Sequence, residues 1–64
     1  MTVKEFLEKT TGVDEYEFEA RDAWTCCRAN EKERVIKTYG ERKIISILFY
    51  VDTYEDKCAE IEME

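Results

Sequence analysis

The chain has 64 residues, a formal net charge of −6 at pH 7, three cysteines, and neither histidine nor proline. This length indicates a single domain over residues 1–64, and the negative charge argues against nucleic acid or an anionic membrane as a direct partner. No apolar stretch approaches the ~20 residues that cross a bilayer, and without histidine or a C-x-x-C pair neither a metal nor another cofactor is expected.

The first element expected is a helix of about two turns that begins after Thr2. Thr2 and Glu5 have the spacing of a capping box, in which each side chain accepts a hydrogen bond from the other residue's backbone N–H. Gly12 can adopt the left-handed conformation that stops a helix. The apolar face of the segment comprises Val3, Phe6 and Leu7. So short a helix must dock on another element.

Two strands are expected next. Residues 15–22 alternate between apolar and charged side chains, which is typical of an antiparallel strand with one face in water. Residues 23–29 alternate less clearly, with Trp24 and Cys26 on one face and Thr25 and Cys27 on the other. We predict a second strand there, with a turn near residues 21–23, although no glycine or asparagine marks that turn.

A second helix is predicted over Glu31–Tyr39. Asn30 and Glu33 have the spacing of a helix start, and Gly40 follows in the position of a left-handed helix stop. The alternative is a strand over Arg34–Tyr39, because that stretch is rich in β-branched residues.

The longest apolar run is K-I-I-S-I-L-F-Y-V at residues 43–51. Both faces of this run are mostly apolar, which predicts a central strand with a cover on each side. A polar turn over residues 52–56 and a last strand over residues 57–64 complete a hairpin. The expected fold is therefore an α+β domain with the order α-β-β-α-β-β, a small antiparallel sheet and two short helices.

Domains of this size commonly need an additional source of stability, such as disulfides, a bound metal or a second subunit. An odd number of cysteines, two of them adjacent, and no secretory leader indicate free thiols in a reducing cytoplasm rather than disulfides. A homodimer is therefore expected, with a second copy covering part of the apolar strand, and the cytoplasm is the expected location.

Acidic residues gather on single faces of two expected strands. The members are Glu15, Glu17 and Glu19 in one strand and Glu60, Glu62 and Glu64 in the other. As neighbours, these strands would form one carboxylate field able to imitate a phosphate backbone; the alternative is an ordinary solvated face. Like charges directly across a sheet repel. We therefore expect either that the strands are apart or that lysine and arginine side chains lie between them.

Trp24 and Tyr50 are candidate anchors for a partner, since aromatic residues are enriched at binding hot spots. Core packing explains Tyr16 and Tyr39 equally well. The candidate partner-binding residues are Glu15, Glu17, Glu19, Trp24, Tyr50, Glu60 and Glu62.

Catalysis is not expected, and no catalytic residue is assigned. The chain has no histidine base and no glycine-rich phosphate loop, and it is too short to offer much of a cleft for paired carboxylates. A thiol-dependent redox protein is a remote alternative, because Arg28 follows Cys27 and a nearby cation favours thiolate.

The segments T-V-K-E-F-L, Y-G-E-R-K-I-I-S-I and I-E-M-E resemble small uncharacterised proteins carried by bacteriophages and mobile elements of Firmicutes. The resemblance touches both ends of the chain and leaves residues 14–37 largely unmatched. It implies a setting in which a small accessory protein binds a host protein. The expected function is thus a non-catalytic protein-binding module. The alternative is an acidic inhibitor that imitates DNA and occupies a nucleic-acid-binding host defence enzyme.

Overall fold

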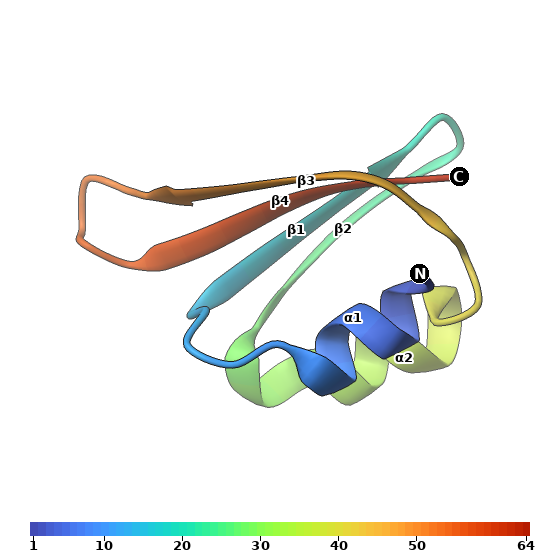
Figure 1. Ribbon diagram of the computed structural model, residues 1–64, viewed down its shortest axis with the longest axis horizontal. Coiled ribbons are helices and arrows are strands. Elements are labelled where there is room, and N and C mark those ends of the chain that lie inside the picture. The colour runs from blue at the N-terminus through green and yellow to red at the C-terminus, as the bar shows by residue number, and fades with distance from the viewer.

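The computed structural model describes residues 1–64, and it has two layers, a four-stranded sheet and a pair of helices (Figure 1). This confirms the α+β class and the order α-β-β-α-β-β. The elements are α1 (Val3–Lys9), β1 (Glu15–Ala20), β2 (Ala23–Arg28), a 3-10 turn (Ala29–Glu31), α2 (Lys32–Tyr39), β3 (Ile44–Val51) and β4 (Lys57–Met63).

The strands lie in the order β2-β1-β4-β3. The β1–β2 and β3–β4 hairpins are antiparallel, whereas β1 and β4 are parallel. The sheet is therefore mixed, and the prediction of an antiparallel sheet is wrong for its central pair. The prediction that residues 43–51 form a central strand is wrong, because β4 inserts between β1 and β3 and leaves β3 at the edge. Ile45, Leu48 and Val51 of β3 are each about 60% exposed as a result.

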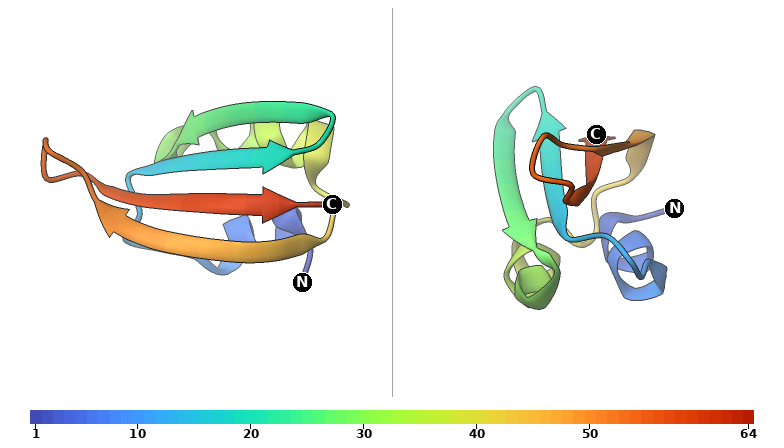
Figure 2. Two further views of the ribbon diagram at one scale, coloured as in Figure 1. Left: turned by 90° about the horizontal axis from the view of Figure 1, so that it is seen from above. Right: turned by 90° about the vertical axis from the view of Figure 1, so that its left-hand side faces the viewer.

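Both helices cover the same face of the sheet, and the other face carries no element (Figures 1 and 2). The apolar face of α1 and Val35 of α2 pack against alternate residues of the strands. The core therefore lies in one layer between the helices and the sheet. Its largest fully buried side chains are Tyr16, Phe18, Leu7, Ile61, Met63, Val3 and Val35.

The start of α1 follows the sequence signal, whereas its end does not. The Glu5 carboxylate accepts a hydrogen bond from the N–H of Thr2 at 2.9 Å, and the Thr2 hydroxyl accepts one from the N–H of Glu5 at 3.2 Å. Gly12 has φ +79°, in the left-handed region. The predicted capping box is confirmed. The predicted helix stop is wrong, because α1 ends at Lys9 with an extended Thr10, and the left-handed Gly12 turns the chain only after the helix has ended.

The helix predicted over Glu31–Tyr39 is confirmed against its strand alternative, with two corrections at its ends. Asn30 lies inside the 3-10 turn, and the Glu31 carboxylate instead accepts from the N–H of Arg28 at 2.8 Å. Gly40 is right-handed, with φ −56°. Glycine is required there for space, since a Cβ atom would collide with the carbonyl oxygen of Ile36.

The turn between β1 and β2 consists of Arg21 and Asp22, and neither residue has a positive φ. This explains why the turn needs no glycine or asparagine. Arg42 donates to both carboxylate oxygens of Asp22, at 2.6 and 2.8 Å, and to the backbone oxygen of Glu64 at 3.1 Å. The paired guanidinium lowers the pKa of Asp22 to about 2. Arg42 thereby joins the turn, the start of β3 and the end of the chain.

Candidate partner-binding face

The sheet face that points away from the helices is called the open face here. Alternation along each strand, together with the pairing register, places three residues of every strand on it. They are Glu15, Glu17 and Glu19 of β1, Trp24, Cys26 and Arg28 of β2, Ser46, Leu48 and Tyr50 of β3, and Cys58, Glu60 and Glu62 of β4. All seven candidate residues from the sequence therefore lie on one surface.

The two acidic strands are neighbours, with Glu17 opposite Glu60 and Glu19 opposite Glu62. We call these four residues the acidic columns; the columns are about 4.8 Å apart, the spacing of adjacent strands. The expectation that cations lie between adjacent acidic strands is wrong for these four, because none of them forms an ion pair. Glu62 accepts one hydrogen bond, from Ser46 Oγ at 3.1 Å.

Glu15, at one end of the first column, does have a cation. Its carboxylate lies 2.6 Å from Nη1 of Arg28, on the neighbouring strand β2. Glu64 follows the end of β4 and pairs through its backbone N–H with Lys43. The unneutralised charge of the open face is thus concentrated on the acidic columns.

Apolar and aromatic side chains border the acidic columns on both sides. Trp24, opposite Glu19, is 58% exposed, and Leu48, opposite Glu60, is 60% exposed. Tyr50 is paired with Cys58 in the register of β3 and β4, and it is 40% exposed. Leu48 was not among the residues predicted from the sequence, although its two-residue spacing from Tyr50 places both on one face. A face with an acidic centre and exposed aromatic margins differs from an evenly charged, solvated one.

The crowded carboxylates lead to a prediction about salt. Replacing Glu17 and Glu60 together by glutamine should raise the free energy of unfolding by about 0.5–1 kcal/mol at low salt, because like charges opposite each other in a sheet destabilise it. Added salt should stabilise the native protein through screening. The double variant should lose most of that salt effect. Denaturant titrations in low and high NaCl provide the measurement.

Glutamine at Glu8 and Glu41 is the matched control, since both are exposed and neither forms an ion pair. A control variant stabilised as much as the Glu17 and Glu60 variant would mean that net charge, rather than the columns, sets the effect.

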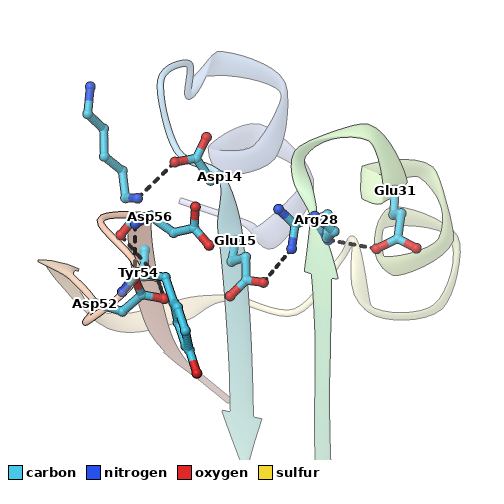
Figure 3. Close-up of polar contacts among 9 residues, drawn as sticks. Asp14, Glu15, Arg28, Glu31, Asp52, Tyr54 and Asp56 are labelled. Carbon is cyan, nitrogen blue, oxygen red and sulfur yellow. Dashed lines mark hydrogen bonds and ion pairs between the residues drawn. The ribbon is translucent and has the colours of Figure 1, made fainter.

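One end of the open face is fixed by backbone hydrogen bonds to carboxylates (Figure 3). Oδ2 of Asp14 accepts from the N–H of Lys57 at 2.8 Å. Oδ1 of Asp52 accepts from the N–H groups of Tyr54 and Asp56, at 2.8 and 2.9 Å. These contacts hold the β3–β4 turn, where Glu55 adopts a φ of +67°. The starts of β1 and β4 are therefore held in register.

Possible metal ligands meet at the same end, where single ligand atoms of Glu15, Asp52 and Cys58 lie within 4.8 Å of one another. Glu15 already pairs with Arg28. Burial raises the pKa of Cys58, and the Asp52 charge raises it further. The thiol form is favoured and one carboxylate is engaged, so this group does not have the features of a prepared metal site.

All three cysteines are free thiols, and only Cys26 is exposed. Burial raises the pKa of Cys27. The Arg34 charge lowers that pKa and the Glu31 charge raises it, both by less than burial does. A reactive cysteine needs the opposite shift. The environment of Cys27 therefore does not favour thiolate chemistry.

A second prediction concerns alkaline pH. Burial raises the pKa of Cys27 and Cys58 above 9.0 and that of Tyr16 and Tyr50 above 10.0. The unfolded chain therefore loses these protons first as pH rises. Stability should be full below about pH 9 and should fall as pH rises through the raised pKa values. Urea unfolding at pH 7, 9 and 10.5 measures this, and a flat profile would contradict the assignment.

Comparisons with protein-family models, with curated proteins and with solved structures found no match to this chain. Neither helix has the length and apolar character needed to span a bilayer.

Proposed function

We propose that this chain is a non-catalytic binding module whose open face docks on the basic surface of another protein. The observation that carries the proposal is the set of acidic columns, four carboxylates without a cation, bordered by Trp24, Leu48 and Tyr50. In keeping with the phage and mobile-element resemblance, the partner is a host protein and the setting is the cytoplasm.

The chemistry of the face fits a partner rich in arginine or lysine. Cations of the partner would relieve the repulsion between the columns, and opposite charges would speed encounter. Trp24 and Tyr50 can stack on arginine side chains or fill apolar pockets. The centre of the face would then supply selectivity for a basic surface, and its margins would supply apolar contact area.

The test is affinity capture from a host lysate with three forms of the protein. Lysine at both Glu17 and Glu60 reverses the centre of the open face, whereas lysine at both Glu8 and Glu41 makes the same change in net charge elsewhere. We expect a basic protein that is captured by the wild type and by the control. The amount captured by the variant with the reversed face should be at least tenfold lower. A partner captured equally by all three forms would contradict the proposal.

A specific feature also favours the alternative of a nucleic-acid mimic that inhibits a host defence enzyme. Successive glutamates of one column are about 6.6 Å apart along a strand, so the two columns together carry about one charge per 3.3 Å. A single strand of duplex DNA carries one charge per ~3.4 Å of axis. The acidic columns therefore match the charge density of one nucleic-acid strand over a short length.

Competition distinguishes the two functions once a partner has been captured. A mimic should be displaced from its partner by duplex DNA, and its affinity should fall steeply as salt rises. A general protein-binding module should resist DNA and should lose more affinity when Trp24 or Tyr50 is truncated than when the glutamates are neutralised.

A further inference from the structure

The two edges of the sheet are protected very differently. At the β2 edge, the Arg34 guanidinium donates to the backbone oxygen of Cys26 at 2.5 Å and to the Thr25 hydroxyl at 3.3 Å. A charged side chain on an edge strand is a common device against unwanted pairing. The β2 edge is thereby blocked to an incoming strand.

The β3 edge has a cover only at its beginning. Thr2 forms a bridge with Lys43, and the backbone oxygen of Met1 accepts from the N–H of Ile44 at 2.9 Å. From Ser46 to Val51 the strand pairs only with β4, and Ile45 lies at an irregularity in that pairing. The outer backbone groups from Ile45 to Val51 therefore have no partner in the chain. The free edge is seven residues long, and none of these residues is charged.

Exposed apolar side chains line this free edge. The exposed set comprises Ile45, Leu48, Phe49, Tyr50 and Val51. The end of β3 and the following turn project beyond both helices (Figure 1), and Phe49 is the residue of this part that still lies near α1, with its ring centre 6.3 Å from that of Phe6. A long, uncharged and apolar edge strand is a template for pairing with another strand.

We propose that the free edge of β3 pairs with the same edge of a second copy of this chain, in antiparallel orientation, to form one continuous eight-stranded sheet. β3 is the only strand of the chain without a charged side chain. Self-pairing therefore places uncharged, mostly apolar residues opposite one another on both faces, which no other strand of this protein would do.

The extent of the free edge also fixes the register of the pairing. Directly opposite residues of an antiparallel pair lie on the same face, and the midpoint of Ile45–Val51 is Leu48. Leu48 would lie on the two-fold axis, with Ile47 opposite Phe49. Ser46 would lie opposite Tyr50, and Ile45 opposite Val51. This register uses the whole free edge and leaves Asp52 outside it.

The net charge of −6 on each copy does not oppose this arrangement at physiological salt. The Glu60 columns of the two copies would be three strand spacings apart, about 14 Å. The Debye length is about 8–10 Å at 0.1–0.15 M salt. The repulsion between copies is therefore largely screened, and it should weaken the dimer only at low salt.

Sedimentation velocity over a hundredfold range of concentration tests the proposal. The wild type should approach twice 7.7 kDa at high concentration. Lysine at both Ile45 and Val51 puts like charges opposite each other at both ends of the pairing and should give a folded monomer. Lysine at both Trp24 and Tyr54, which are also exposed and lie outside the paired residues, should remain dimeric. A monomeric wild type, or a dimer that survives the edge substitutions, overturns the proposal.

Cross-linking tests the register in a Cys26→Ser background, which removes the other exposed thiol. In the proposed register Leu48→Cys faces its own copy, within disulfide reach. Phe49→Cys would lie about 8 Å from its copy, beyond that reach. Oxidation should cross-link two copies of the Leu48→Cys variant at least tenfold faster than two copies of the Phe49→Cys variant. Equal or reversed rates would overturn this pairing. Neither readout depends on a host partner, so failure here is distinct from failure of the proposed function.

Discussion

Replacing Ile61 with alanine should lower the free energy of unfolding by about 2–5 kcal/mol, the range for truncating a buried isoleucine. Ile61 is 1% exposed and lies in the central strand β4, opposite Phe18 of β1 and Ile47 of β3. The truncation leaves a cavity beneath three strands. In a domain whose total stability is of the order of 5 kcal/mol, much of the protein would then be unfolded.

The matched control is Leu48→Ala in the neighbouring strand β3, measured in dilute solution so that self-association does not contribute. Leu48 is 60% exposed, and its truncation should change stability by no more than about 0.5 kcal/mol. Urea titrations followed by Trp24 fluorescence give both values. Equal losses, or a larger loss at Leu48, would mean that β3 rather than β4 occupies the centre of the sheet.

Replacing Lys32 with methionine should lower the free energy of unfolding by about 2–3 kcal/mol. The Lys32 ammonium donates to the backbone oxygens of Leu7 and Thr10, each at 2.8 Å, and lies 5.4 Å from the ring centre of Tyr16. The last carbonyls of a helix lack partners within the helix. A hydrogen bond from a charged donor contributes about 1.5–3 kcal/mol. The substitution removes two of them at the end of α1.

The control for this prediction is Lys37→Met, an exposed lysine on the same helix. It should change stability by less than about 0.5 kcal/mol. Hydrogen exchange adds a local readout. In Lys32→Met the amides of α1 should exchange faster than the fall in global stability accounts for, whereas the exchange rates of amides in β1 and β4 should change only as much as global stability does. Indistinguishable behaviour of the two lysine variants would show that Lys32 does not hold α1 in place.

The local features of this fold were predictable because they depend on neighbours in the chain. The two-residue alternation of β1 and β4 predicted which of their side chains share a face, and Thr2 with Glu5 predicted the start of α1. The β1–β2 turn had no clear signal, since Arg21 and Asp22 need no positive φ and are held by the distant Arg42. Likewise, nothing near Gly40 in the sequence reveals the carbonyl of Ile36 that excludes a side chain there.

The order of strands was not predictable from the same patterns. An apolar run with two apolar faces, such as Ile44–Val51, suits a buried central strand or an edge strand that pairs with another copy. Composition alone does not separate these cases. The parallel pairing of β1 with β4 depends on how the two hairpins dock, and that is a long-range property.

The candidate site was predictable as a set of residues but not as a surface. The sequence identified both acidic faces and the flanking Trp24 and Tyr50. Only the register shows that Glu17 lies opposite Glu60 and that no cation separates them. The contribution of Leu48 to the margin depends on the edge position of β3.

The most direct test of the binding role of the open face is an amide NMR titration with a short arginine peptide as a generic basic probe. We expect shifts concentrated on β1, β4 and the Trp24 indole, with at least tenfold weaker binding when Glu17 and Glu60 are both lysine. Shifts spread evenly over the helices and loops, or binding unaffected by that double substitution, would contradict a basic-surface role for the acidic columns.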